Sequence, residues 1–313
     1  MGEKLTLGIL VFNQGKYVSA LLDSVGQQTY RNCPLVIVDN SSSDDSLEQI
    51  EASLFRNSLE EHTTIIRNER NYGSAEGLRQ LLENSSTKYL SVIHGDDILE
   101  SNYVETVMRT LSTGYSCNAL NITLMAFPNT PSISVPKKFY RPLWVSNTFV
   151  NRILVCGLNP GVMPGSVLDR DFVLNRNFLN FESHVNGVED TLLWMRIIRS
   201  GGKIQSLFSP CYKYRIHESQ FSYSDSRNSF YYGFARRIII QESKTFIEGL
   251  LSKAEISHEI KRFGISSGYV EGLGPEYFSR HKIFSLLRVF NICVRRLALM
   301  SVARRYRYSH PPK

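Results

Sequence analysis

The chain has 313 residues and a net charge of +7, and its 42% hydrophobic and 21% charged residues are typical of a globular protein. This composition excludes a disordered chain and a fibrous protein. The five cysteines lie far apart and form no CxxC pair. That spacing argues against a disulfide scaffold or a zinc site, and it favours a reducing compartment.

Positive charge is concentrated at the end of the chain. Residues 280–313 contain nine Lys and Arg and no acidic residue, so the rest of the chain carries a charge of −2. A nucleic-acid-binding body spreads basic charge over its own surface, so we expect no nucleic-acid partner. The uncharged runs of this tail are far shorter than the roughly twenty residues of a membrane span. We expect peripheral contact with an anionic membrane surface, with a solvated tail or packing in a homo-oligomer as open alternatives.

The first hundred residues alternate strand and helix patterns. Short apolar runs predict buried strands at 5–12, 35–38, 63–66 and 89–93. Helical spacing of apolar residues predicts helices at 16–28, from an N-cap at 43–45 to residue 55, and at 74–84. Such repeats predict an α/β fold with a parallel sheet and helices on both faces, whose ligands bind beyond the carboxyl ends of the strands.

The pattern is less regular beyond residue 100. The predicted elements are a helix at 101–111, a strand at 119–126, a proline-rich loop at 127–142, a strand at 162–168, a helix at 189–199, and short strands at 204–208 and 212–216. From residue 227 onward the chain is predicted to be mostly helical.

Polar clusters follow three of the predicted strands. Asn13 follows the first, residues 39–44 the second, and residues 94–97 the fourth. Adjacent Asp96 and Asp97 suit a hard divalent cation, which prefers oxygen ligands. One such cluster alone is ordinary turn or N-cap chemistry. Three at successive strand ends favour a ligand site.

Further motifs follow in a fixed order along the chain. The segment 7–46 reads LGILVFNQGKYVSALLDSVGQQTYRNCPLVIVDNSSSDDS, and it is followed by Asn71-Tyr72-Gly73, His94-Gly95-Asp96-Asp97, Glu189-Asp190 at the start of a helix, and Tyr214-Arg215-Ile216-His217. This ordered set, over about residues 5–223, resembles the family 2 glycosyltransferases of the GT-A fold, in particular bacterial surface-polysaccharide and O-antigen enzymes.

The resemblance implies a fold and an activity. The fold is GT-A, a Rossmann-like, mostly parallel central sheet flanked by helices, in a catalytic domain at 1–225 with a helical C-terminal region at 226–313. The activity is that of an inverting glycosyltransferase, which moves a sugar from a nucleotide-sugar, with UDP favoured, to a hydroxyl of a saccharide or a lipid-linked saccharide. We expect a cytoplasmic protein on the inner face of the plasma membrane.

The resemblance also implies roles for particular residues. The nucleotide-sugar is expected to contact Phe12, Asn13, Asp39, Asn71, Gly73, His94 and Asp96. Asp190 matches the catalytic base, with Glu189 beside it. Mn²⁺ or Mg²⁺ is expected at Asp96, Asp97 and His217, where a purely structural role for His217 stays open.

One position departs from the family pattern. His94 replaces the first Asp of the metal motif and removes one negative charge. The alternative function is therefore a catalytically decayed nucleotide-sugar-binding protein of the same fold.

Overall fold

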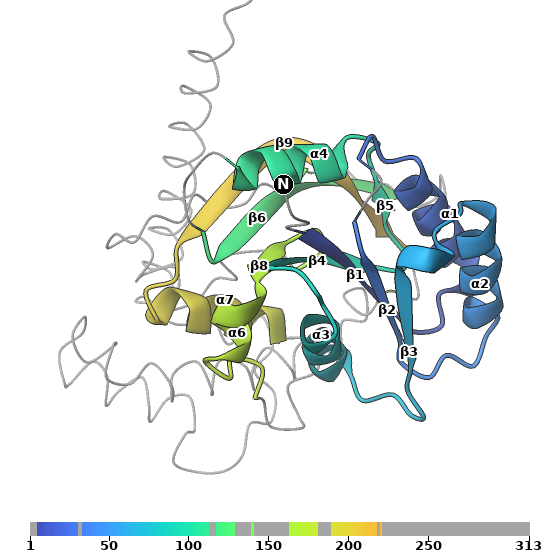
Figure 1. The fold of residues 1–313 in the computed structure, drawn as a ribbon, viewed down its shortest axis with the longest axis horizontal. Helices are drawn as coiled ribbons and strands as arrows, with labels where there is room; N and C mark the ends of the chain where they lie inside the picture. Colours follow the sequence, from blue (N-terminus) through green and yellow to red (C-terminus); the bar gives the residue numbers. More distant parts are fainter. Residues whose placement is uncertain are drawn as a thin grey trace, which may run out of the picture.

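The computed structural model describes residues 5–30, 33–112, 117–128, 139–140, 163–180, 189–217 and 220. In this part of the chain, nine strands form one sheet with helices on both faces (Figure 1). The strands are β1 (Leu5–Val11), β2 (Leu35–Asp39), β3 (Thr63–Arg67), β4 (Tyr89–His94), β5 (Ile98–Leu99), β6 (Ala119–Pro128), β7 (Phe139–Tyr140), β8 (Val167–Asp169) and β9 (Ile204–Ile216). The helices are α1 (Gly15–Gly26), α2 (Ser46–Arg56), the 3₁₀ helix η1 (Glu60–His62), α3 (Ser74–Glu83), α4 (Tyr103–Leu111), α6 (Arg170–Leu174) and α7 (Glu189–Arg199).

Strands β1 to β4 form the parallel part of the sheet. β1 lies in parallel between β2 and β4, and β2 pairs in parallel with β3. The four strands predicted for this region are confirmed to within one residue at each end. Because parallel strands run in the same direction, the carboxyl ends of β1, β2 and β4 lie at one edge of the sheet.

Alternation of side chains along these strands builds two cores. Leu7 and Ile9 of β1 pack in the core that includes α1, α2 and α4. Val36 of β2 and Leu90 of β4 pack on the other face, with α3, α6 and α7. Figure 1 shows α3 and α4 on opposite sides of the sheet. Successive strand residues point to opposite faces, so burial on both sides explains the unbroken apolar runs of the sequence.

Beyond β4 the sheet becomes mixed. Its strand order is β3-β2-β1-β4-β8-β6-β9-β5, with β7 paired to β6. β8 runs antiparallel to both β4 and β6, and β9 runs parallel to β6 and antiparallel to β5. The parallel order predicted from the strand–helix repeats thus ends at β4, where the regular repeat in the sequence also ends.

Three local predictions need correction. Of the strand predicted at 162–168, the described residues form a strand only from Val167, in β8. The predicted loop at 127–142 contains paired residues, because β6 extends to Pro128 and Met125 pairs with Phe139 of β7. The two short strands predicted at 204–208 and 212–216 are one strand, β9. Its register against β6 shifts, with Ile122 opposite Leu207 and Leu124 opposite Tyr212. Pro210 lies within that shift, and its missing N–H explains why the sequence indicated a break there.

The predicted C-terminal helical region and basic tail at 226–313 lie outside the described residues, as does the predicted domain boundary at residue 225.

A three-residue loop, Gly95 to Asp97, joins β4 to β5. In the strand order these two strands are separated by β8, β6 and β9. Four strand spacings in a flat sheet amount to about 19 Å. The four Cα–Cα steps from His94 to Ile98 reach at most about 14 Å even when fully extended. The sheet must therefore curl so that β5 returns toward the end of β4.

Gly165, just before β8, offers a test of this packing. Its φ of +76° lies in the left-handed region, and a Cβ there would meet the Tyr212 ring at 2.7 Å. Gly201 has the same φ of +76° with no atom within 4 Å of an added Cβ. We expect Gly201→Ala to cost about 1–3 kcal/mol of unfolding free energy from backbone strain alone. Gly165→Ala should cost about 1–3 kcal/mol more from overpacking.

Urea unfolding of the two variants and the wild-type protein measures this difference. Equal losses in the two variants would contradict the tight contact between Gly165 and the Tyr212 ring.

Candidate active site

The predicted site residues after β1, β2 and β4 meet at the carboxyl edge of the sheet. Asp39, the last residue of β2, lies opposite Val11 of β1, and His94, the last residue of β4, lies opposite Leu10. Two strand spacings therefore separate Asp39 from His94, roughly 10 Å. Phe12, which follows β1 between them, is 44% exposed. An exposed aromatic residue thus follows the strand that lies between those carrying Asp39 and His94.

The loops after β1 and β2 are tied to each other. The Asp39 carboxylate accepts hydrogen bonds from the Ser42 backbone N–H, at 3.2 Å, and from the Ser42 hydroxyl. Asn13 accepts from the Ser43 N–H at 2.8 Å, and its own N–H donates to the Ser42 hydroxyl at 2.9 Å. Asn13 has a φ of 52°, a conformation that Asn adopts more readily than most residues. These bonds hold the Asp39 side chain in a buried position, with 2% exposure, at the carboxyl edge of the sheet.

An amide network forms the loop after β3. The Asn40 side chain donates to Asn71 Oδ1 at 2.7 Å, and the Gly73 N–H donates to the same oxygen at 2.8 Å. Asn68 donates to Asn40 Oδ1 at 3.1 Å. Gly73 has a φ of 88°, which favours glycine at this turn. Asn71 thus builds the loop beside Asp39. Asn40 belongs to the polar cluster noted at 39–44, whereas Asn68 was not selected from the sequence.

The loop after β4 gathers His94, Asp96 and Asp97. One ligand atom from each lies within 4.8 Å of the others. Asp96 is 6% exposed, and its Oδ2 lies 2.9 Å from Nε2 of His217, which is also 6% exposed. The second oxygen of Asp96, Oδ1, is buried and has no hydrogen-bond partner among the described residues.

The donor set at this loop fits a divalent cation. A buried carboxylate oxygen without a partner is costly, because its lost hydration is not replaced. Carboxylate oxygen suits Mg²⁺ or Mn²⁺, and imidazole nitrogen is also a metal ligand. Asp96 with His217 or His94 therefore meets the chemical requirement of such a site.

Asp97 is held differently from Asp96. It is fully buried, its Oδ2 accepts from the Tyr212 hydroxyl at 2.6 Å, and its Oδ1 accepts from the Arg215 backbone N–H at 2.8 Å. The Arg215 guanidinium donates from Nε to the Asp96 carbonyl at 2.6 Å. Both donors come from β9. The sequence motif around His217 included Arg215 but gave no role to it or to Tyr212.

Burial and neighbouring charges set the protonation of this loop. Burial lowers the pKa of His94, and the nearby negative charges of Asp96 and Asp190 oppose that shift. Burial raises the pKa of Asp97 well above its usual range, and the Asp96 charge adds to this, although hydrogen bonds from Tyr212 and Arg215 act in the other direction. His94 is therefore neutral at neutral pH.

Glu189 and Asp190 form the first turn of α7, as predicted for this helix. The influence of the Asp190 charge on the pKa of His94 places the Asp190 carboxylate near the loop after β4. The helix is anchored by Leu193 and Trp194, which are fully buried. Trp194 thus belongs to the core, and α7 brings its N-terminus, which favours negative charge, to the site.

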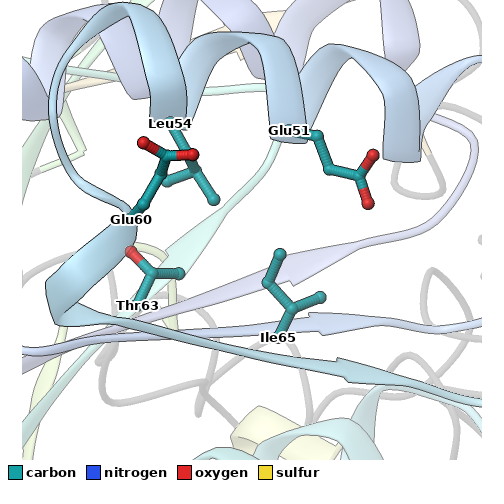
Figure 2. Close-up of a pocket in the computed structure, with 5 residues that line it drawn as sticks. All are labelled: Glu51, Leu54, Glu60, Thr63 and Ile65. Carbon is teal, nitrogen blue, oxygen red and sulfur yellow. The ribbon is translucent and has the colours of Figure 1, made fainter.

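A separate cavity of about 230 Å³ lies between α2, η1 and β3 (Figure 2). Its lining residues are Glu51, Leu54, Glu60, Thr63 and Ile65. Thr63 begins β3, so the cavity reaches the amino end of that strand, whereas the predicted site residues follow the carboxyl ends. None of the predicted site residues lines it.

Part of the chain matches a known protein family. Residues 6–156 match the family described as Glycosyl transferase family 2. That segment therefore belongs to glycosyl transferase family 2. It contains the predicted site residues from Phe12 to Asp97.

Two curated proteins that resemble this chain are bacterial glycosyltransferases. Over 107 residues the chain is 25% identical to glycosyltransferase GlyG of Streptococcus pneumoniae, covering 34% of this chain and 35% of that protein. Over 218 residues it is 27% identical to the Escherichia coli UDP-Glc:alpha-D-GlcNAc-diphosphoundecaprenol beta-1,3-glucosyltransferase WfgD, covering 67% of this chain and 76% of that protein. The match to GlyG thus spans about a third of that relative's length.

Solved structures share the fold. S. aureus TarS 1–349, in complex with UDP-GlcNAc, superposes with a TM-score of 0.60 at 17% identity, covering 84% of this chain and 73% of TarS. The mannosyltransferase PcManGT from Pyrobaculum calidifontis, in complex with GDP-Man and Mn²⁺, gives a TM-score of 0.56 at 12% identity, covering 96% of this chain and 88% of that chain. Together with the family match, these structures confirm the predicted GT-A fold.

Among the helices in the described ranges, none is both long enough and apolar enough to cross a membrane.

Asp44, in the loop before α2, makes the stability of the fold depend on pH. Burial alone would raise its pKa, but hydrogen bonds from the Ser46 hydroxyl and from the backbone N–H groups of Gly15 and Ser46 lower it overall. A lowered folded-state pKa means that Asp44 stabilises the fold above the unfolded pKa of about 3.9. This contribution is lost as the pH falls through the folded-state pKa. We therefore expect Asp44→Asn to destabilise the protein at pH 7, with a difference from wild type that shrinks toward pH 3.

Urea unfolding between pH 7 and 3 tests this expectation, with Asp45→Asn as the control. Asp45 is the next residue and lies at the same helix N-terminus, but its carboxylate accepts from the Gln49 side chain at 3.2 Å. Parallel stability curves for wild type and Asp44→Asn at every pH would contradict the assignment.

Proposed function

We propose that the protein is a glycosyltransferase that moves a sugar from a UDP-linked donor to a hydroxyl of a saccharide or lipid-linked saccharide. The family match and the names of the relatives support the class of reaction. The observation that carries the proposal is the buried Asp96 carboxylate, with one oxygen unpartnered, beside His94 and the charge of Asp190. This is the arrangement that a diphosphate, a cation and a base require in one place.

The donor would bind across the carboxyl ends of β1, β2 and β4. Asp39 would accept hydrogen bonds from the uracil or ribose, and Phe12 and Asn13 would line the base pocket. Asn71 and Gly73 would form the wall of this pocket through the loop after β3. His94 would hydrogen-bond the ribose as a neutral imidazole. The UDP-GlcNAc complex of TarS, which has the same fold, supports this choice of donor.

Asp96 would hold Mn²⁺ or Mg²⁺, with His217 as a neighbouring nitrogen ligand. Such a cation neutralises the charge that grows on the leaving nucleoside diphosphate. Asp97, the other predicted ligand, has both oxygens engaged by β9, so we propose for it a supporting part that is developed below.

Asp190 would act as the general base. Its carboxylate takes the proton of the acceptor hydroxyl while that oxygen bonds to the anomeric carbon of the donor sugar. The bond from this carbon to the phosphate oxygen breaks, and its electron pair leaves with UDP. Attack from the face opposite the leaving group inverts the anomeric centre. Glu189, the neighbouring carboxylate in the first turn of α7, would flank the acceptor.

The base assignment predicts a specific loss of chemistry. We expect Asp190→Asn to lower the rate of sugar transfer by about a hundred- to ten-thousand-fold while UDP still binds, because general-base catalysis contributes about that much. Asp171→Asn is the control, since Asp171 is a carboxylate in the first turn of α6 with a 64% exposed side chain. UDP release from a panel of UDP-sugars, with Mn²⁺ or Mg²⁺, measures the rate.

An Asp190→Asn protein that binds UDP and transfers at the wild-type rate would remove the base assignment. A wild-type protein that binds UDP but never releases it from a donor would favour the decayed, non-catalytic alternative marked by His94.

We also propose attachment of the basic tail at 280–313 to the inner face of the plasma membrane, where lipid-linked acceptors would be reached. Each Lys or Arg near an anionic surface contributes about 1 kcal/mol. We therefore expect the full chain to co-sediment with phosphatidylserine vesicles and not with phosphatidylcholine vesicles. Replacement of Arg295, Arg296, Arg304 and Arg305 by Gln should abolish this binding. Equal binding of both proteins would leave the tail without a membrane role.

A further inference from the structure

Tyr212 of β9 holds the loop after β4 by its hydroxyl group. The hydroxyl donates to Asp97 Oδ2 at 2.6 Å and accepts from the His94 backbone N–H at 3.2 Å. Tyr212 and Asp97 are both fully buried. One atom of β9 thus binds both ends of the loop that carries Asp96.

The rest of β9 completes this contact. Arg215 holds Asp97 Oδ1 through its backbone N–H and the Asp96 carbonyl through its guanidinium, at 2.8 and 2.6 Å. The guanidinium carbon itself lies 5.0 Å from the centre of the Tyr17 ring and 4.8 Å from that of Phe127. Aromatic faces attract such a cation, so the Arg215 side chain is fixed in turn.

The two adjacent carboxylates are therefore in different situations. Both oxygens of Asp97 are consumed by donors from β9, whereas Oδ1 of Asp96 has no partner among the described residues. The loop is a turn, closed by a hydrogen bond from the Asp97 N–H to the His94 carbonyl at 3.1 Å, so fixing Asp97 restricts the backbone that carries Asp96. We propose that Tyr212 is a positioning residue which, through Asp97, aims the Asp96 carboxylate at the divalent cation.

This inference rests on the proposed function, because it requires a cation at Asp96. Partners behind a metal ligand matter for affinity, and their removal typically costs about ten- to a hundred-fold in metal binding or activity. Tyr212 contacts Asp97 and not Asp96 itself, so its effect on the cation would pass through the backbone of the loop. The readout must therefore separate cation binding from general stability.

The test is the Mn²⁺ dependence of UDP binding, measured by calorimetry as the ratio of the UDP dissociation constants in EDTA and in Mn²⁺. We expect Tyr212→Phe to leave UDP binding in EDTA unchanged and to lower this ratio about tenfold. Activity is not needed for this measurement.

Tyr103→Phe is the matched control. Tyr103 is also fully buried, and its hydroxyl also makes two hydrogen bonds, at 2.6 Å to Ser91 Oγ and at 2.8 Å to the Gly165 carbonyl. Its ring lies edge-on to Tyr212 with centroids 5.9 Å apart, so the two variants disturb the same core. We expect Tyr103→Phe to lower the thermal midpoint as Tyr212→Phe does while leaving the Mn²⁺ ratio at the wild-type value.

Three outcomes overturn the inference. A Tyr212→Phe protein with the wild-type ratio, in a wild type that responds to Mn²⁺, overturns it alone. An equal loss of the ratio in Tyr103→Phe assigns the effect to core stability. A wild type whose UDP binding ignores Mn²⁺ shows that the proposed cation site is itself wrong.

If Tyr212→Phe does not fold, Asp97→Asn takes its place. The amide keeps the side-chain volume and the bond from the Arg215 N–H, but it presents an NH₂ group to the Tyr212 hydroxyl in place of an acceptor. The ratio should again fall, and a folded Asp97→Asn protein with the wild-type ratio overturns the inference.

Discussion

Two adjacent carboxylates buried at the end of β4 set the main constraint on this structure. Asp96 and Asp97 are 6% and 0% exposed, and burial of charge is costly unless hydrogen bonds or counter-charges compensate. The compensation comes from Tyr212, Arg215 and His217, which belong to β9 or directly follow it. The loop can therefore exist in this form only because β9 passes beside it.

Because of this constraint, different strands of the sheet position different parts of the site. The parallel strands β1, β2 and β4 deliver Asn13, Asp39 and His94 to one edge, and hydrogen bonds such as that from the Ser43 N–H to Asn13 join the loops there. β9 does not pair with any of these strands, yet Tyr212 and Arg215 of β9 hold the loop that carries Asp96 and Asp97. The register shift in β9 between Leu207 and Tyr212 sets which residues face the loop. Bulges of this kind commonly re-aim side chains beside functional sites.

Much of the carboxyl edge of the parallel strands could be predicted from the sequence. Apolar runs and helical spacing gave the elements from β1 to α3, and parallel order then placed Asp39 and His94 on either side of β1. The hydrogen bond between Tyr212 and Asp97 spans 115 residues and depends on the pairing of β5 with β9. No local pattern encodes that pairing, because β5 has two residues and Pro210 suggests a break. The hydrogen bond between Asn40 and Asn71 could not be predicted either, since single amides in loops give no periodic signal.

The short link from β4 to β5 also limits how this chain can vary. The three residues of the link form a turn, closed by the hydrogen bond from the Asp97 N–H to the His94 carbonyl, so β5 must begin close to the end of β4. Its side chains are also restricted, because a Cβ at Gly95 would clash with Gln14 Oε1 and because both oxygens of Asp97 accept hydrogen bonds from β9. An added or deleted residue would shift β5 against β9 by one position and turn every side chain of that short strand to the opposite face. The turn thus restricts the identity of residues 95 and 97 as well as the number of residues between the two strands.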